Sequence, residues 1–478
     1  MKQLLLIAAS EWRYWTRSYL ALSGTVLFMV LLIVTSLLTG MHSEEQAHER
    51  EHHQTEAENT FLAQPDRHPH RMVHYGHYVF RSPAPLALFD PGLDPVIGQS
   101  IFLEGHRQNS AMFADSGSSA NVGGLSWLTP AMVYQLFGPL LVILLGHGAI
   151  VRERESGTLA HLLAQGISGR SLIVGKGLAL LCFIILLLVP LLFSAIFSLS
   201  HGEEVLSALS LIGVYLLYLS MWGMMTLFFS SILQKRSTIL ATLTALWLGL
   251  VLVLPSIAVS IAERAVPLAG KIETDLIMQE DIRKLGDGHK PNDPAFKQLR
   301  ANILKQYDVE KIEDLPVNFR GIVAMNAEKN LTGVLNDYAD VRMTKETQQA
   351  QALSDYGWLS PKLAIANASR AISGTDLEHY HRFLREAEEL RFDFVQGLNN
   401  SHAEKLTYQD DMNRNRDDAS GLKARVDATS WEVLNVFDFQ PASAVDRINN
   451  AFQSIMMLMF WFALLIAALL WSGRRLQP

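Results

Sequence analysis

Long runs of apolar residues alternate with ordinary polar sequence along this chain of 478 residues. About 20 consecutive apolar residues cross a hydrocarbon core of roughly 30 Å, so each run predicts a membrane-spanning helix. Pro139, Pro190 and Pro255 fall inside three of the runs, where they predict kinks of the kind that membrane helices tolerate. The pattern therefore predicts an all-α polytopic membrane protein with six transmembrane helices, at residues 19–40, 128–150, 172–198, 205–233, 238–261 and 454–471.

The first 17 residues differ from the spans because charged and aromatic side chains interrupt their apolar positions. A cleaved signal peptide has a short apolar core followed by small residues, which is a different pattern. On a helix, Gln3 and Arg13 fall on one face and Leu4 and Trp12 on the other. Tryptophan favours the headgroup depth of a bilayer, so residues 1–17 predict an amphipathic elbow helix lying in the interface.

Lysine and arginine are distributed unequally between the two sides of the predicted bundle. With the N-terminus inside, the inner segments carry eleven Lys and Arg residues but only three acids, Glu11, Glu153 and Glu155. The two long outer segments, residues 41–127 and 263–450, are net acidic. Because positive charge marks the cytoplasmic side, we expect both termini, including the tail at residues 472–478, in the cytoplasm.

The first outer segment, residues 41–127, is rich in histidine. Imidazoles bind zinc, copper or nickel, and His48 and His52 have the i,i+4 spacing that places both rings on one helix face. No fixed pattern of carboxylates or cysteines marks a closed metal site, so a solvated histidine-rich loop is the simpler interpretation. The candidate ligands are His48, His52, His53, His68, His70, His74 and His77.

The second outer segment, residues 263–450, is long enough for a folded domain, and much of it has helical periodicity. One long helix is predicted from Asn318 to about Asp355. A second begins near Asp376, whose side chain is a good N-cap, and runs to about Leu398. The segment therefore predicts a large, mostly helical periplasmic domain, and its residues form no recognisable catalytic arrangement.

Ionisable side chains are missing from the middle of all six predicted spans, and Lys176 lies at the inner entry of the third. Ion-coupled carriers need such groups, so the composition argues against a secondary transporter. The glycine-rich stretch 169–177 lacks the spacing of a Walker A motif, and the net charge of −7 gives no nucleic-acid footprint. Any ATP-driven work therefore requires a separate ATPase, and no enzyme activity is predicted.

A charged insert at residues 151–171 joins the second and third spans on the inner side. A turn of a few residues would suffice to reverse the chain. Acids and bases come first in the insert, and a Gly-Thr pair and a leucine-containing helical stretch follow. A capped, solvated turn is one interpretation. The other, which we favour, is a cytoplasmic coupling helix that lies parallel to the membrane and contacts a soluble partner.

The sequence RERESGTLAHLL at residues 152–163, followed by SGRS and a Gly-Lys pair, resembles the coupling-helix motif of permease subunits of type-2 ATP-binding-cassette (ABC) exporters. That motif runs ERExGTLxxLL, and this chain departs from it at residues 165–167, where proline is common. The resemblance implies that the insert docks on the ATPase. The implied contact residues are Arg152, Glu153, Arg154, Glu155, Gly157, Thr158, Leu159, Leu162 and Leu163.

A second resemblance covers the outer domain. Leu359-Ser-Pro361, the run from Ala371 to Asp376, and the residues from His379 to Phe383 are similar to bacterial permeases with a large extracytoplasmic domain of unassigned function. Together the resemblances imply a multi-pass inner-membrane transport subunit that binds no cofactor itself, because ATP and Mg²⁺ belong to the partner. The implied partners are two ATPase subunits, a second permease protomer in a homo- or heterodimer, the lipid bilayer and a periplasmic protein, but no nucleic acid.

Two other functions stay open at this point. ATP hydrolysis inside the cell can move the outer domain against an envelope partner while nothing crosses the bilayer, which would make the chain a mechanotransmitter or scaffold. The histidine-rich segment can instead serve copper or zinc handling. The sequence names neither a substrate nor a dimer partner.

Overall fold

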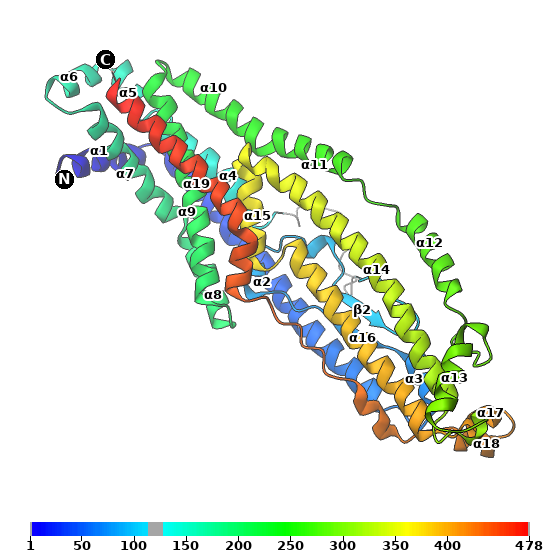
Figure 1. Ribbon diagram of the computed structural model, residues 1–478. Helices are drawn as coiled ribbons and strands as arrows, with labels where there is room; N and C mark the ends of the chain where they lie inside the picture. The colour runs from blue at the N-terminus through cyan, green and yellow to red at the C-terminus, as the bar shows by residue number, and fades with distance from the viewer. Residues whose placement is uncertain (1, 113–127, 477–478) are drawn as a thin grey trace.

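The computed structural model describes residues 2–112 and 128–476. Within these ranges the chain forms an elongated, predominantly helical molecule (Figure 1). Both termini lie at one end, which we call the terminal end, and we call the opposite end the distal end. Residues 113–127 of the predicted first outer segment and residues 477–478 of the predicted tail lie outside the described residues.

The elements follow one another in a simple order. The first part contains α1 (Lys2–Thr16), α2 (Tyr19–Leu62), α3 (Pro69–Tyr75), β1 (His77–Phe80), β2 (Ser100–Leu103), α4 (Pro130–Gly146), α5 (Val151–Glu155), α6 (Thr158–Ala164), α7 (Gly169–Leu187), α8 (Val189–Ser200) and α9 (Val205–Ile232). The second part contains α10 (Arg236–Trp247), α11 (Leu254–Ala265), α12 (Lys271–Lys284), α13 (Lys297–Gln306), α14 (Phe319–Asp355), α15 (Pro361–Ser373), α16 (Leu377–Lys405), α17 (Tyr408–Asn413), α18 (Asp418–Lys423) and α19 (Ala444–Arg474).

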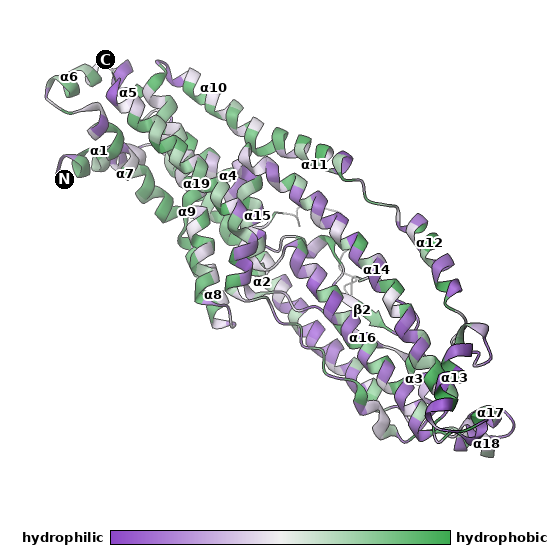
Figure 2. Cartoon of the chain, in the orientation of Figure 1, coloured by the Kyte–Doolittle hydropathy of each residue, from purple (hydrophilic) through white to green (hydrophobic). Residues whose placement is uncertain are grey.

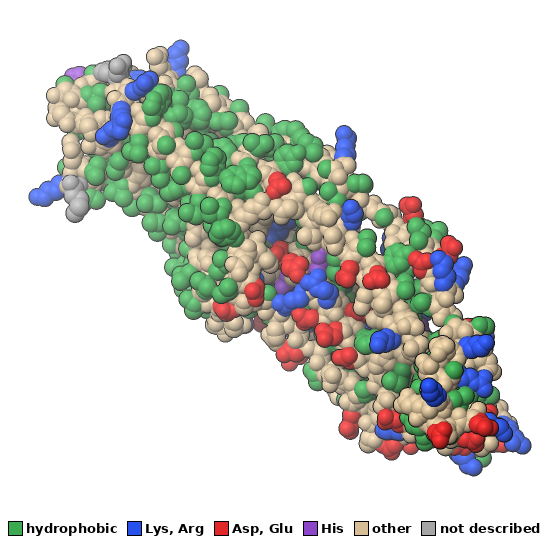
Figure 3. Space-filling model, viewed as in Figure 1, with side chains coloured by type: hydrophobic (Ala, Val, Ile, Leu, Met, Phe, Trp, Pro, Cys, Tyr) green, Lys and Arg blue, Asp and Glu red, His purple; other side chains and the backbone are tan. Residues whose placement is uncertain are grey.

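Six helical segments in the described part of the chain are long and apolar enough to cross a membrane: Tyr19–Leu62, Pro130–Glu155, Gly169–Leu187, Val205–Ile232, Arg236–Ala265 and Ala444–Arg474. Their apolar residues occupy the terminal half of the molecule in Figure 2. The space-filling view shows a broad hydrophobic surface over the same half, whereas charged side chains gather over the distal half (Figure 3). The described chain is predominantly helical and contains six candidate spans. The predicted fold class, an all-α polytopic membrane protein, is therefore confirmed.

The helix α2 is much longer than the span predicted at residues 19–40. The Ser18 side chain accepts a hydrogen bond from the amide of Ala21 at its start, and the helix continues for 44 residues. At 1.5 Å per residue it measures about 66 Å, roughly twice the thickness of a hydrocarbon core. Proline is absent until Pro65, so nothing in the backbone ends the helix at the membrane surface. The predicted loop therefore begins as a continuation of the first span.

The third predicted span, residues 172–198, is two helices, because α7 ends at Leu187 and α8 begins at Val189. Pro190 lies in the first turn of α8, where its missing N–H is tolerated, but it cannot continue the hydrogen bonding of α7. Before Pro255 the fifth span contains a π-helical segment, Leu248–Val253, and α4 runs through Pro139 without a break.

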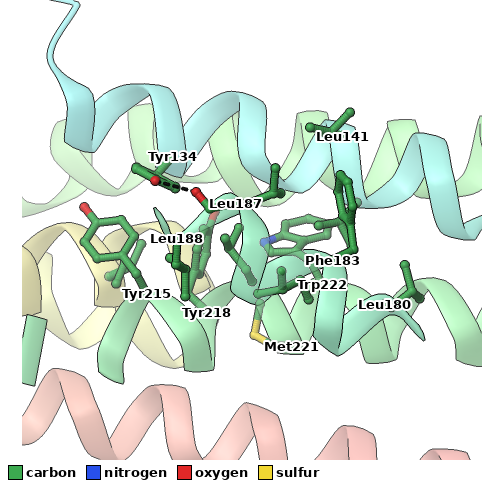
Figure 4. Packing of buried hydrophobic residues seen from close by; sticks show 14 of the residues in the cluster. Tyr134, Leu141, Leu180, Phe183, Leu187, Leu188, Tyr215, Tyr218, Met221 and Trp222 are labelled. Carbon is green, nitrogen blue, oxygen red and sulfur yellow. Dashed lines mark hydrogen bonds between the residues drawn. The ribbon is translucent and has the colours of Figure 1, made fainter. Parts of the chain in front are cut away.

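The core of the membrane half packs aromatic side chains of α4, α7 and α9 against one another (Figure 4). Tyr134, Tyr218 and Trp222 are fully buried there. The two tyrosines keep hydrogen-bond partners, since Tyr134 donates to the carbonyl of Leu187 at 2.6 Å and Tyr218 to that of Gln135 at 2.8 Å. These bonds join α4 to the end of α7 and to α9.

The distal half is built on the long helices α14 and α16, which lie side by side (Figure 1). Asn318 and Asp376 accept hydrogen bonds from the first turns of α14 and α16, as their residue types predict. Gly321 allows the close approach, because a Cβ there would lie 2.4 Å from the backbone nitrogen of Ala403. The strands β1 and β2 pair antiparallel, with His77 opposite Leu103.

The helix α15 does not lie where its sequence position suggests. It belongs to the segment predicted as the outer domain, yet it packs against α9 and α19. Ala364, Ile365, Ala368, Ala371 and Ile372 are buried in the same core cluster as the membrane helices. The boundary between the membrane bundle and the outer domain therefore lies within residues 263–450, and α15 belongs with the bundle.

Candidate functional site

The insert at residues 151–171 forms two short helices, α5 and α6, followed by the start of α7. Gly157 separates them with a φ of 73°, and Gly166 follows α6 with a φ of 85°. Both values lie in the left-handed region that glycine adopts without a steric cost. A Cβ at either position would meet no described atom within 4 Å, so the requirement is for backbone conformation alone. These two turns place α6 beyond the bundle at the terminal end (Figure 1).

Four charged side chains, contributed by α1, α5 and α7, form one cluster at the base of the insert. Glu11 of α1 forms ion pairs with Lys176 of α7 and with Arg152 of α5. The Oε1 atom of Glu153 lies 3.0 Å from Nζ of Lys176 and 3.8 Å from Nη2 of Arg152. Glu11 is 1% exposed and Lys176 2%. Two acids thus balance two bases, as burial of charge requires, and we call these residues the buried charge network.

Beside this network, α1 packs against the bundle through two aromatic side chains and through close contact with a glycine of α7. The guanidinium of Arg152 lies 3.7 Å from the ring centroid of Tyr14, which is a cation–π contact. Trp15 donates from its indole nitrogen to the carbonyl of Leu145 at 3.1 Å. Gly175 of α7 leaves room for Ile7, since a Cβ there would lie 2.7 Å from that side chain. These contacts join the N-terminal helix to α4, α7 and the insert.

The remaining charges of α5 join it to the corner between α9 and α10. The carboxylate of Glu155 accepts hydrogen bonds from the backbone and the guanidinium of Arg236, at 2.9 and 2.5 Å. Arg154 donates to the carbonyls of Ser231 and Leu233 at 2.9 and 2.8 Å. Each charged residue of α5 is therefore engaged within the chain.

The structure accordingly divides the predicted contact residues into two groups. Arg152, Glu153, Arg154 and Glu155 hold the insert in place, as described above. Leu159 is only 1% exposed and packs within the chain, whereas Leu162 and Leu163 are partly buried and partly exposed. Gly157 and Thr158 are exposed, and Thr158 donates to Oε2 of Glu153 at 2.6 Å. Contact of these residues with an ATPase stays a prediction.

The buried residues of α1 are Ala8, Glu11 and Trp15. The helical pattern places Ala8 and Trp15 on the apolar face, so only the burial of Glu11 was unexpected. An acid within an amphipathic helix is expected to face water, so the pattern gave no sign of the partner of Glu11. The one available signal was Lys176, a cation inside an apolar run that needs a nearby acid.

A chain of polar side chains lies where α15 meets the bundle. Lys362 of α15 donates to Gln135 of α4 at 2.7 Å, and Gln135 donates to the hydroxyl of Tyr215 of α9 at 2.8 Å. Tyr215 lies 3.0 Å from the hydroxyl of Ser369, which donates in turn to Asp90. Burial raises the pKa of Asp90 and lowers the pKa of Lys362 to about 8. We call this set the junction chain.

An ion pair reinforces the junction on its other side. Arg447 of α19 pairs with Glu203, and both side chains are almost fully buried. Arg447 also donates to the carbonyl of Ile372 at the end of α15, at 3.0 Å. Glu204 accepts a hydrogen bond from the amide of Ala444 at 2.7 Å. The start of α9, the end of α15 and the start of α19 are thus held together.

The histidines proposed from the sequence as metal ligands do not form one site. His48, His52 and His53 are exposed along α2, and His77 is buried in β1, where burial lowers its pKa to about 4. His68 lies 3.2 Å from Oδ1 of Asp411. The pair that stays together is His70 and His74 on α3, whose Nε2 atoms are 3.2 Å apart.

Comparison with known families agrees with this architecture. Residues 108–256, which include α4 to α10 and the insert, match the family described as ABC-2 family transporter protein. Residues 271–440, which include α12 to α18, match a domain of unknown function, DUF3526. No curated relative matches the chain. The chain therefore combines an ABC-2 transporter membrane domain with a DUF3526 domain C-terminal to it.

Proposed function

We propose that this chain, an ABC-2 transporter membrane domain followed by a DUF3526 domain, is the permease subunit of an ABC exporter whose separate ATPase docks on α6. The observation that carries the proposal is the position of α6. Two glycines set it outside the bundle, and the buried charge network fixes its base to α1 and α7. A force applied to α6 is therefore transmitted to the membrane helices through these contacts.

The docking surface is the exposed face of α6. Ala160, His161 and Ala164 are exposed there, and their spacing places them on one side of the helix; the exposed Gln165 follows directly after its end. The ATPase contacts this face, while the charged residues of α5 act as positioning residues that transmit the movement. This division differs from the expectation drawn from the motif, in which the charged residues themselves touch the ATPase.

The terminal end lies in the cytoplasm of a bacterial cell, and the distal half lies in the periplasm. Lysine and arginine support this orientation because they outnumber acids in the segments at the terminal end. Two copies of the permease, or this chain and a related one, pair with two ATPase subunits. ATP hydrolysis then occurs on the partner, and this chain converts the closing of the ATPase pair into a rearrangement of its helices.

The docking proposal is tested by copurification of the ATPase with the full-length chain in detergent or nanodiscs. The double variant His161→Glu, Ala164→Asp places two acids on the exposed face of α6 and should abolish copurification. The matched control is His201→Glu, an exposed histidine in the connection between α8 and α9. Normal ATPase recovery with the α6 variant, at unchanged thermal stability, would refute the docking surface.

A second measurement separates export from mechanical transmission. The permease and its ATPase are reconstituted in proteoliposomes, and ATP-dependent flux of candidate substrates is followed together with distance changes between labels on α2 and α14. Flux that requires ATP supports an exporter. Distance changes without flux for every candidate would favour the mechanotransmitter and overturn the export part of the proposal.

A further inference from the structure

Four imidazole rings converge on the surface of the distal half. Two come from α3, His70 and His74, a third is His106 in the turn after β2, and the fourth is His289 in the turn after α12. One ring nitrogen of each lies within 4.8 Å of a ring nitrogen of every other. Three segments that are far apart in sequence thus bring four residues of one ligand type together.

The backbone around the cluster holds these rings in place. His70 and His74 are four residues apart on α3, so they share a helix face. The amide of Gly105 donates to the carbonyl of Val73 at 2.9 Å, which fastens the turn that carries His106 to α3. His106 itself has a φ of 69°, a left-handed conformation that is uncommon for a residue other than glycine. Such strain is often found at functional sites.

Carboxylates orient two of the four rings from behind. Nδ1 of His106 lies 2.9 Å from Oε2 of Glu328, a fully buried carboxylate that Arg391 pairs with at 2.5 Å. Nε2 of His106 is buried and has no hydrogen-bond partner among the described residues. In the same way, Nδ1 of His289 lies 3.1 Å from Oδ1 of Asp287. A carboxylate behind a histidine is the usual outer-shell arrangement of metal ligands, and it leaves the other ring nitrogen free to coordinate.

The cluster is also electrically suited to a cation. Burial, together with the neighbouring rings, lowers the pKa of His70 to about 2, and the pKa of His74 is lowered for the same reasons. Both shifts favour the neutral ring of His70 and His74, which is the form that binds metal.

The second group of metal-ligand residues in the described chain, His68, His402 and Asp411, is different. Asp411 is fully buried and already accepts hydrogen bonds from Arg414 at 2.5 Å and from Asn318 at 3.1 Å, in addition to those from the two histidines. Its oxygens are occupied by protein donors, so this group is structural.

We propose that His70, His74, His106 and His289 form a binding site for one divalent transition-metal ion that prefers imidazole, Zn²⁺ or Cu²⁺. Zn–N bonds of about 2.0 Å in a tetrahedral site separate the ligand atoms by roughly 3.3 Å. The ring nitrogens lie within 4.8 Å of one another, so they must close by at most about 1.5 Å. His74 and His289 are exposed and can make that movement, and they also give the ion a route from solvent. The inference does not depend on the proposed export function.

The experiment uses the full-length chain, purified without a histidine tag and stripped of metal, in nanodiscs. Titration with Zn²⁺ or Cu²⁺ in competition with a chromophoric chelator should reveal one tight equivalent per chain, whereas Mg²⁺ and Ca²⁺ should not compete. The variant His70→Asn, His74→Asn should weaken binding by more than about 100-fold, because losing an outer-shell partner alone costs 10–100-fold. His289→Asn should also weaken it, and this turn is too exposed for the change to unfold the protein.

The control is His48→Asn, His52→Asn, which removes two exposed histidines with the same spacing from α2. It should leave the tight equivalent unchanged. Co²⁺ added to the wild-type chain should give the visible absorption of a nitrogen-ligated ion, and this absorption should vanish in His289→Asn. Equal weakening by the α2 control, or a tight equivalent that survives the loss of His70 and His74, would overturn the proposed site.

Discussion

Replacing Glu11 by glutamine tests whether the buried charge network holds the coupling insert to the bundle. Glutamine keeps the size of the side chain but removes its charge. Lys176 and Arg152 would then share one acid, Glu153, although Lys176 is only 2% exposed. Breaking a buried ion pair costs about 3–5 kcal/mol because a charge is left uncompensated. Glu153 stays 3.0 Å from Lys176, so we expect the lower limit, about 3 kcal/mol.

The assay is a double-mutant cycle with Lys176→Met, which removes the facing charge at similar length. Each single variant leaves an unbalanced charge, but the double variant leaves Arg152 opposite Glu153 and restores neutrality. The double variant should therefore lose less stability than the sum of the singles, by at least about 1 kcal/mol. The free energy of unfolding is measured by denaturant titration in a mild detergent, and Glu45→Gln, an exposed acid on α2, is the control.

Two results would refute this reasoning. One is a loss of less than about 0.5 kcal/mol for each single variant, which is the range of neutral surface substitutions. The other is strict additivity, which would mean that Glu11 and Lys176 do not sense each other. In the complex with its ATPase, the Lys176→Met variant should keep the partner bound, because the exposed face of α6 is untouched. It should, however, lose substrate-stimulated ATP hydrolysis.

Three further predictions follow from single positions. Gly157→Ala should cost about 1 kcal/mol of left-handed backbone strain and lower ATPase affinity, whereas the same change at Gly213, in open space within α9, should not lower affinity. Gly321→Ala should destabilise the outer domain by about 1–3 kcal/mol in denaturant titration, because its Cβ meets the backbone of Ala403; unchanged stability would contradict the close packing. Although burial acts to raise the pKa of Asp411, hydrogen bonds from its histidine partners hold it well below the usual 3.8. The stabilisation is therefore complete above that value and should fall by about 1.4 kcal/mol per pH unit below it, a slope that Asp411→Asn should remove.

The membrane spans and the long outer helices were predictable because their signals are local. A run of apolar residues or an N-cap such as Asp376 acts within one helix. The sequence predicts a span that ends at residue 40 and a helix-compatible polar run after it, but not that the two form one continuous helix. A hydrophobic boundary does not end a helix when the polar residues beyond it also favour helix, as those from Ser43 to Asn59 do.

The pairings that build the sites were not predictable, because they join residues far apart in sequence. Glu11 and Lys176 are separated by 165 positions, and the residues next to either one give no indication that these two side chains pair. His70 and His74 were named only among the candidate ligands of the histidine-rich segment, whereas the i,i+4 spacing had drawn attention to His48 and His52. His106 and His289 lie alone in turns and reach the cluster only through the fold. The packing of α15 against the membrane helices was not predictable for the same reason, since its alanines are equally suited to a bundle core and to an outer domain.

The helix α9 connects the two halves of the proposed mechanism. Near its terminal end, the Ser230 hydroxyl accepts hydrogen bonds from the amides of Ile150 and Val151 at the start of α5, at 3.0 and 3.3 Å. In its distal part, Tyr215 belongs to the junction chain, and Glu203 just before the helix binds α19. A continuous helix of 28 residues is about 42 Å long, so α9 joins these two sets of contacts directly. Under the proposed mechanism, α9 is therefore the element that passes a displacement of α5 to α15 and α19. These helices join the bundle to the outer domain, so movement of an ATPase docked on α6 would reach that domain through contacts that already exist.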